Sequence, residues 1–269
     1  ALGLLVGSVF DRAERATYIL VPTSVPFFFL TGTAYPLDQM PRFIAALSHL
    51  IPATAGVHTF VPLNQMHASL GEVTIPALTL ASLAIGYACG MFLTADVVCH
   101  IACGKSAFDT GVGNPGMANV GHELGVKWAG VVLAGDIGKT LLAWLICRAL
   151  FPADAAAAGV MAGLGATLGH NYPAWHHFSG GKGVTTTCSA IFLTNPALGL
   201  LACLAGLFEV LFCGYLCVGA IVISATWLVL SVLFGDAYQI VVAVALLVLM
   251  VIAHGGPTLG IRDGSTGKA

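Results

Sequence analysis

The chain has 269 residues, of which 58% are hydrophobic and 8% are charged, and its mean hydropathy is +0.92. Soluble domains carry about 25% charged residues, so this composition excludes an ordinary soluble domain and indicates a helical membrane protein. The formal net charge of −2 argues against a nucleic-acid-binding surface. No segment with a basic start, an apolar centre and a cleavage site precedes the body, so we expect no cleavable signal peptide.

The first quarter of the chain differs from the rest. An apolar run at 16–35 is interrupted by two prolines and is followed by a turn and an amphipathic stretch. The likeness of this part to known proteins lies in Phe29-Leu-Thr-Gly-Thr-Ala-Tyr-Pro-Leu-Asp-Gln-Met-Pro41, in Leu-Ile-Pro at 50–52 and in Leu-Asn-Gln-Met at 63–66. These residues resemble the C-terminal part of ABC-2-type exporter permeases. The resemblance implies a permease-like segment at 1–75, ahead of a main domain at 76–269.

Apolar segments follow one another from about residue 76 onward, with short breaks between them. Runs of this composition are typical of membrane-spanning helices. Their expected bounds are 76–100, 127–151, 155–169, 184–194, 197–213, 217–234 and 237–253. The sequence therefore predicts an all-α, polytopic transmembrane helical bundle with about seven spans in 76–253 and one or more apolar segments before it.

The breaks between these segments differ in charge. One side of the membrane would hold the breaks at 101–126, 170–183, 214–216 and 254–269, and the basic residues in or beside them are Lys105, Lys127, Lys182, Arg262 and Lys268. The breaks on the other side contain Asp154 and Asp236 and no lysine or arginine. Because loops rich in lysine and arginine stay in the cytoplasm, we expect the first side, with the C-terminus, to be cytoplasmic.

The first of these cytoplasmic breaks is rich in glycine and asparagine and includes Gly111-Val-Gly-Asn-Pro-Gly-Met-Ala-Asn119. It matches G-x-G-x-x-G, but the dinucleotide fingerprint follows a β-strand, and an expected membrane helix precedes it here. Glycines still let backbone N–H groups approach an anion, and asparagine amides can donate to it. A plain turn between two spans is the alternative reading. The candidate phosphate-binding residues of this loop are Gly111, Gly113, Asn114, Gly116 and Asn119.

The second break holds the densest polar stretch of the chain, at 169–187. It is not a P-loop, because His176 stands where the first glycine of that motif would be and glycine follows Lys182. Backbone donors, one ammonium group and the start of a helix nevertheless favour a bound anion. The candidate phosphate-binding glycines are Gly180, Gly181 and Gly183, with Lys182 as a catalytic candidate. His170 is a candidate proton acceptor near neutral pH.

An aspartate and a lysine inside an expected span, and a histidine near the C-terminus, complete the candidate residues. Asp136 and Lys139 are three residues apart on one expected helix, so they can pair toward the bundle interior, in a supporting or a purely structural role. His254 directly follows an apolar run and is the third catalytic candidate. A zinc site built from the histidines at 170, 176 and 177 would lack a carboxylate or thiol ligand. We therefore expect no metal and no cofactor.

Residues from about 80 to 269 resemble the acyl-phosphate:glycerol-3-phosphate acyltransferase family (PlsY-type). The family's GSGNxGxTN-like motif corresponds to the stretch 111–119. Its GHxFP and GGKGVAT motifs correspond to Gly169-His-Asn-Tyr-Pro173 and to Gly180-Gly-Lys-Gly-Val-Thr-Thr186. Asp136 and Lys139 fall where the family has an aspartate and a lysine. His254 stands at the start of the terminal HRxN-like motif.

The resemblance implies a reaction of phospholipid biosynthesis in the bacterial inner membrane. A fatty acyl group would pass from acyl phosphate to the 1-hydroxyl of glycerol 3-phosphate, giving lysophosphatidate and inorganic phosphate. The implied partners are these two substrates and the lipid bilayer, with no protein partner inferred. Direct transfer by positioning and charge neutralisation is the expected mechanism.

Several motif positions depart from the family pattern. Val112 replaces a serine, Phe108 replaces an arginine, Cys217 and Ala220 replace serines, and Gly255-Gly-Pro257 replaces the residues that follow the motif histidine. One alternative is therefore a catalytically weakened, acyltransferase-like protein that binds lipid. The other is a membrane transporter or permease subunit, which predicts polar residues spread through several spans.

Overall fold

The structure is a computed structural model, and it describes residues 26, 28–34, 36–41, 44–45, 48, 51–66 and 74–261. Much of the expected permease-like segment, including 1–25, and the basic residues Arg262 and Lys268 lie outside the described residues. The chain divides into two compact units, Ala1–Ala81 and Ser82–Ala269. All regular elements in the described part are helices, so the all-α prediction is confirmed.

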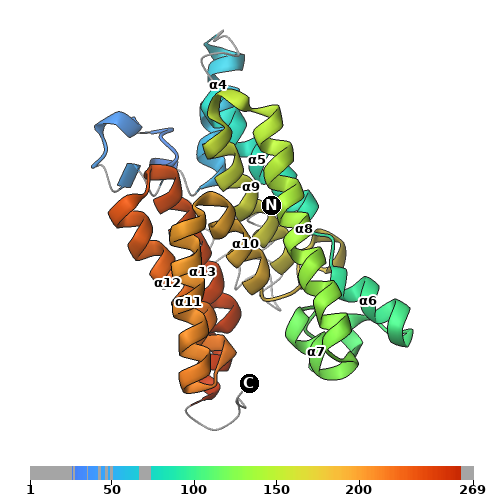
Figure 1. Cartoon of the computed structure of the whole chain (residues 1–269). Helices are drawn as coiled ribbons and strands as arrows, with labels where there is room; N and C mark the ends of the chain where they lie inside the picture. The colour runs from blue at the N-terminus through green and yellow to red at the C-terminus, as the bar shows by residue number, and fades with distance from the viewer. Residues whose placement is uncertain are drawn as a thin grey trace. The chain divides into compact units, whose positions relative to one another are not determined.

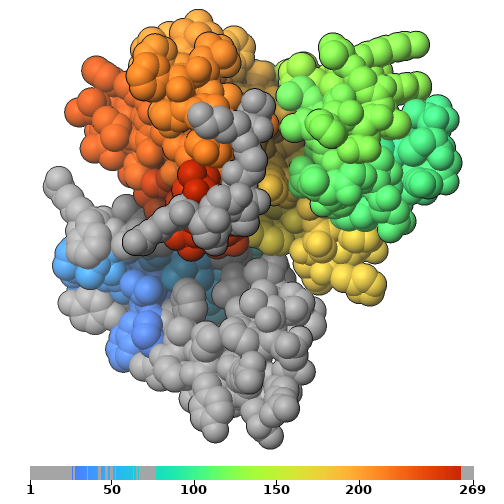
Figure 2. Space-filling view, turned by 90° about the horizontal axis from the view of Figure 1, so that it is seen from below, coloured from blue at the N-terminus to red at the C-terminus, as the bar shows by residue number. Residues whose placement is uncertain are grey.

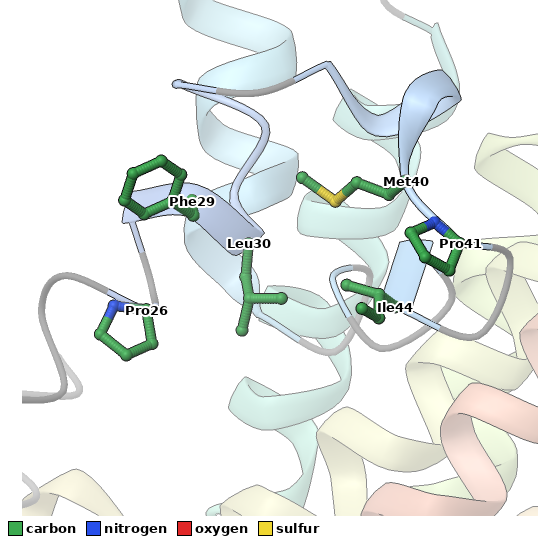
Figure 3. Close-up of a pocket in the computed structure, with 6 residues that line it drawn as sticks. All are labelled: Pro26, Phe29, Leu30, Met40, Pro41 and Ile44. Atoms are coloured by element: carbon green, nitrogen blue, oxygen red, sulfur yellow. The ribbon is translucent and has the colours of Figure 1, made fainter.

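The described part of the first unit contains the 3₁₀ helix η1 (Leu37–Gln39), α4 (Pro52–Gln65) and the first residues of α5 (Thr74–Gly90). Pro52 stands at the start of α4, where its missing N–H costs no helical hydrogen bond. A cavity of about 430 Å³ lies in this unit (Figure 3). It is lined by the apolar residues Pro26, Phe29, Leu30, Met40, Pro41 and Ile44.

The second unit continues from α5 through a series of helices joined by short loops (Figure 1). Its elements are α6 (Thr94–Cys103), η3 (Ala107–Asp109), α7 (Met117–Leu124), α8 (Val126–Leu150), η4 (Pro152–Asp154), α9 (Ala155–Asn171), η5 (Ala174–His176), α10 (Val184–Thr194), α11 (Pro196–Cys213), α12 (Leu216–Phe234) and α13 (Ala237–Gly260). Each of the seven apolar segments expected from the sequence is therefore helical.

Five stretches of the described chain are long and apolar enough to cross a membrane. They are Ala77–Cys103, Val126–Leu150, Pro196–Cys213, Leu216–Phe234 and Ala237–Gly260. The other two expected spans are shorter, because α9 has 17 residues and α10 has 11. At about 1.5 Å per residue, α10 extends roughly 16 Å, about half of the hydrocarbon core. The first stretch is also interrupted, since α5 ends at Gly90 and α6 begins at Thr94.

Helix α9 lies at the centre of the second unit. It packs against α8, α10 and α13, and Figure 1 shows it between α8 and α10. Its side chains Val160, Met161 and Leu164 belong to the main hydrophobic core, together with Trp227 of α12 and Leu246 of α13. Thirteen of its 17 residues are buried. A helix that is apolar and buried on all sides is an interior helix, which explains why α9 is built from alanine, glycine and other small residues.

Glycines allow α9 to approach the second half of α5 closely. Gly86 and Gly90 of α5 face Gly165 and Gly169 of α9, so both helices carry the small-xxx-small spacing that favours tight contacts in membranes. A Cβ on Gly86 would overlap the backbone carbonyl of Ala162. A Cβ on Gly169 would lie 2.8 Å from the backbone nitrogen of residue 91. This packing brings the interruption after α5 beside the C-terminal end of α9, where the candidate site begins.

Candidate active site

The buried centre of the site is a cluster of three side chains from two helices. Lys139 Nζ lies 2.8 Å from Asp136 Oδ1, one helical turn away on α8. The same ammonium lies 2.8 Å from Nδ1 of His170, at the end of α9. His170 Nδ1 is also 3.7 Å from Asp136 Oδ1. All three residues are at most 6% exposed. The predicted pairing of Asp136 with Lys139 is present, and it extends to a histidine 31 residues further along the chain.

The interruption between α5 and α6 supplies a third partner for this ammonium. Lys139 donates a hydrogen bond of 2.9 Å to the carbonyl of Phe92, within the interruption. The neighbouring carbonyl, of Met91, accepts a 2.8 Å hydrogen bond from the indole N–H of Trp175. A helix break leaves carbonyls without helical partners. Here two such carbonyls tie the break to α8 and to the second glycine-rich loop.

The three contacts of Lys139 determine the proton arrangement of His170. A protonated lysine offers three donors and no acceptor, and its three close neighbours are a carboxylate, a carbonyl and the His170 ring. With Lys139 protonated, Nδ1 of His170 accepts, and the proton of the neutral ring is then on Nε2. The Nε2 edge lies against Gly181, because a Cβ on Gly181 would overlap that atom. The backbone N–H of Gly181 also donates to the carbonyl of His170, at 2.9 Å.

The glycine-rich loop from 180 to 183 is folded closely over the end of α9. A Cβ on Gly180 would overlap the His170 carbonyl and lie 2.5 Å from Cδ of Pro173. Gly183 has a φ of +73°, and a Cβ there would overlap the amide oxygen of Asn171. The glycines are therefore required by close contact as well as by backbone conformation.

Lys182 and His254 are neighbours across the loop and α13. The buried imidazole of His254 lies beside the backbone of Lys182 and within electrostatic range of its ammonium group. The Lys182 backbone is the hydrogen-bond neighbour of this ring, although neither ring nitrogen forms a bond of good geometry among the described residues. Lys182, which is half-buried, makes no ion pair within the described part of the chain. The structure thus brings the three catalytic candidates together at one loop, with His170 against Gly181 and His254 beside Lys182.

The first glycine-rich loop is held by its own asparagine. Asn119 Nδ2 donates to the carbonyl of Thr110 at 2.8 Å, and its Oδ1 accepts from the backbone N–H of Val112 at 3.0 Å. Gly111 and Gly113 have φ values of +58° and +70°. Among the described contacts, both polar atoms of Asn119 therefore serve the loop itself, and the prediction that this asparagine binds phosphate is not tested by them.

The turn that follows in this loop is also held by a hydrogen bond between its own backbone groups. The backbone N–H of Gly116 donates to the carbonyl of Asn114 at 2.8 Å. Gly116 precedes α7 as its N-cap, without a side-chain cap. The contacts found for these two candidates thus lie within the first loop.

An aromatic stack joins the two glycine-rich loops. The rings of Phe108 and His176 are 3.6 Å apart between centroids and inclined by 13°. Trp175 packs edge-on against Phe108 at 6.5 Å. Figure 2 shows the green segment around α7, the yellow segment after α9 and the red end of α13 on one face of the molecule. Phe108, which replaces an arginine of the family pattern, therefore connects the loops by stacking.

The arrangement of the histidines bears on the zinc alternative. His170 is buried against Lys139, whereas the His176 ring stacks on Phe108 and its Nδ1 lies 2.8 Å from the carbonyl of Ser179. The described residues contain no group of three His, Cys, Asp or Glu side chains placed to hold a metal ion. His177 is exposed and adopts a left-handed conformation, with φ of 49°.

Four contributors to the site were not predicted as such. They are the Phe92 carbonyl, Trp175, Asn171 and Thr187. A signal existed for three of them, because Asn171, Trp175 and Thr187 stand inside the polar stretch at 169–187. The role of Phe92 depends on a helix break that no proline marks.

Known proteins resemble this chain in two regions. A family model described as glycerol-3-phosphate acyltransferase matches residues 80–261, and one described as ABC-2 family transporter protein matches residues 1–94. Over 130 residues the chain is 44% identical to a glycerol-3-phosphate acyltransferase 1 of Lactobacillus johnsonii, covering 48% of this chain and 63% of that relative. It is 34% identical over 197 residues to the Roseobacter denitrificans glycerol-3-phosphate acyltransferase, covering 73% of this chain and 96% of that relative.

A solved structure is similar over the same region. The crystal structure of PlsY, an integral membrane glycerol 3-phosphate acyltransferase, in its glycerol 3-phosphate form gives a TM-score of 0.64 at 26% identity. It covers 71% of this chain and 95% of the PlsY chain. The resemblance inferred from the glycine-rich motifs is confirmed. Because the family match extends over 80–261, more than half of the 269 residues, the chain belongs to the glycerol-3-phosphate acyltransferase family.

Proposed function

We propose that residues 76–269 form a membrane acyltransferase, which moves a fatty acyl group from acyl phosphate to the 1-hydroxyl of glycerol 3-phosphate. The products are lysophosphatidate and inorganic phosphate. Membership of the family supports this activity, as do the relatives' names and the forms of PlsY solved with glycerol 3-phosphate and with lysophosphatidic acid.

One observation in this chain carries the proposal. Lys182 has no acidic partner among the described residues, follows two close-packed glycines and lies beside the buried His254. An unpaired ammonium next to backbone donors is suited to a phosphate group. A neighbouring imidazole is suited to a proton that leaves a hydroxyl. Both substrates of the proposed reaction carry phosphate, and one carries the hydroxyl.

The transfer itself breaks one bond and forms one. The 1-hydroxyl oxygen of glycerol 3-phosphate forms a bond with the acyl carbon, and the bond between that carbon and the phosphate oxygen breaks. Phosphate departs with the electron pair of that bond, and the hydroxyl proton passes to a base. Lys182 and the loop N–H groups stabilise the negative charge, and the imidazole of His254 is the proposed base.

The geometry suggests a different role for His170 from the proton acceptor expected from the sequence. Its Nδ1 is engaged by Lys139, and its Nε2 edge faces Gly181. We assign it the task of positioning the loop from 180 to 183. In the first loop, Asn119 holds the backbone at Thr110 and Val112. Gly111 and the side-chain amide of Asn114 remain proposed phosphate contacts, whereas the N–H groups of Gly113 and Gly116 already donate to carbonyls of the loop, so we assign these two glycines to its shape.

Replacing Lys182 by alanine tests the proposed site. Purified protein is given acyl phosphate and glycerol 3-phosphate, and phosphate release is followed. We expect the variant to lose about a hundredfold in kcat/KM, a loss typical for removal of one charge-stabilising group. The exposed Lys127, which lies over the Trp128 ring, gives a matched control, since Lys127→Ala should change the rate by less than about twofold. No release by the unaltered protein contradicts the activity, and equal rates for both variants contradict the role of Lys182.

We further propose that both glycine-rich loops and the C-terminus face the cytoplasm of a bacterial cell, with the chain in its inner membrane. The support is the excess of lysine beside these loops. Val112 and Ser179 are exposed loop residues, and Ala153 is exposed in the break before α9. In right-side-out vesicles, an impermeant thiol reagent should label a cysteine at 153 and spare cysteines at 112 and 179. The exposed Cys103 is first replaced by serine. The opposite labelling pattern overturns the orientation.

A further inference from the structure

Three buried polar side chains, two of them without partners among the described residues, come from the helices around the start of α10. Asn171 is 4% exposed, Thr187 is 1% exposed and His254 is 4% exposed. Both amide atoms of Asn171 and the hydroxyl of Thr187 lack a hydrogen-bond partner among the described residues, and the His254 ring has only the neighbouring backbone of Lys182. Buried polar groups are nearly always paired, and an exception calls for an explanation such as a ligand.

These side chains come from three helices that pack against one another, namely α9, α10 and α13. The Asn171 amide lies against Gly183, since a Cβ on that glycine would overlap Oδ1 and be 3.0 Å from Nδ2, so that both amide atoms lie at this position. Thr187 is one helical turn beyond Gly183, to whose carbonyl its backbone N–H donates at 2.9 Å. His254 lies beside Lys182. Asn171 and His254 therefore lie at the junction between Lys182 and Gly183, and Thr187 lies in the first turn of the helix that begins there.

The junction has the electrostatic character of an anion site. Helix α10 has 11 residues and begins after Gly183, and no side chain caps its free N–H groups. The neighbouring helices differ, because Asn195 caps α11 and Asp236 caps α13 through their side chains. An uncapped helix start with a lysine beside it favours negative charge. The amide N–H₂ of Asn171 and the hydroxyl of Thr187 add neutral donors.

We propose that Asn171 and Thr187 are phosphate-binding residues, which donate hydrogen bonds to a phosphoryl group seated at the start of α10 beside Lys182. The inference deepens the proposed function and rests on it for the identity of the substrate. The phosphoryl group belongs either to acyl phosphate, and is then released as inorganic phosphate, or to glycerol 3-phosphate. The two sources share the same chemistry and are separated by experiment.

The test uses the full chain in detergent and three variants. Asn171→Asp places a negative charge where the phosphate would lie, and Thr187→Val removes a hydroxyl at nearly constant volume. Thr167→Val is the matched control, because Thr167 is also fully buried on α9 but already donates to the carbonyl of Gly163 at 3.2 Å. We measure the KM of each substrate and the inhibition constant of inorganic phosphate. Thermal protection by inorganic phosphate provides a second readout that requires no turnover.

We expect Asn171→Asp to raise the KM of one substrate about tenfold or more and to raise the phosphate concentration needed for thermal protection by a similar factor. Thr187→Val should have a smaller effect, and Thr167→Val none. A joint rise in the KM of acyl phosphate and the phosphate inhibition constant identifies the acyl donor. A rise in the KM of glycerol 3-phosphate alone identifies the acceptor.

If the chain shows no turnover but phosphate protects it in an Asn171-dependent way, the site stands and the proposed function fails. If protection and both KM values match the Thr167→Val control, the phosphate site is refuted. Should Asn171→Asp not fold, Thr187→Val decides by the same criteria.

Discussion

Replacing Lys139 by methionine is expected to lower the free energy of unfolding by about 3 to 5 kcal/mol, the usual cost of leaving one partner of a buried ion pair alone. The ammonium of Lys139 contacts Asp136, His170 and the Phe92 carbonyl, at 2.8, 2.8 and 2.9 Å. Methionine fills a similar volume but donates to none of them. The carboxylate of Asp136, which is 2% exposed, would then be charged and unpaired inside the bundle.

A double variant separates the charge effect from the positioning effect. In Asp136→Asn with Lys139→Met, no unpaired charge remains, so we expect most of the lost stability to return. Activity should stay low, since Nδ1 of His170 still lacks the donor that fixes its ring. Unfolding is followed by denaturant titration of the detergent-solubilised protein, and activity by phosphate release.

The control for this prediction is Lys127→Met, the same change at an exposed lysine. Surface substitutions of this kind alter stability by at most about 0.5 kcal/mol. If Lys139→Met is no more destabilising than the control, the cluster does not hold the site together. If the double variant regains full activity, the contact between Lys139 and His170 has no role in positioning.

The part of this cluster that lies on one helix was predictable from the sequence, and the part that joins two helices was not. Asp136 and Lys139 are three residues apart, a spacing that places two side chains on one face of any α-helix. Their contact with His170 depends on how α8 and α9 are rotated about their axes. That rotation is set by packing, including the approach of α5 to α9 at Gly86 and Gly165.

The apolar segments predicted the positions of the helices well, but they did not predict which of these helices cross the membrane. Hydrophobicity located α9 and α10 but could not show that α9 is enclosed by protein, because an interior helix and a lipid-facing helix are equally apolar. The break between α5 and α6 was also missed, since Met91, Phe92 and Leu93 are as apolar as their neighbours. Its freed carbonyls are satisfied by Lys139 and Trp175, which lie far away in the sequence.

The glycine-rich loops were located correctly because glycine density and polarity stand out against hydrocarbon-facing helix. The roles of the residues within them could not be predicted from the sequence, for a physical reason. In isolation, an asparagine such as Asn119 can bind a phosphate or hold its own loop, and the choice depends on backbone geometry. The same uncertainty applies to a histidine, whose role depends on which nitrogen is already engaged.

The same substitution at two buried histidines distinguishes positioning from proton transfer. In His170→Asn, the amide oxygen can take the place of Nδ1 and accept from Lys139, so activity should remain within about tenfold of the unaltered protein. His170→Ala loses this contact, and its activity should fall about a hundredfold. In His254→Asn, no group that can take a proton remains, and kcat should fall about a thousandfold with little change in either KM. The four proteins are compared by steady-state phosphate release after equal folding is verified by thermal unfolding. If asparagine at 170 is as damaging as alanine, the imidazole of His170 itself takes part in the chemistry. If His254→Asn retains the activity, the base lies elsewhere. The side chain at 254 then serves substrate binding, in line with the place of His254 beside Lys182.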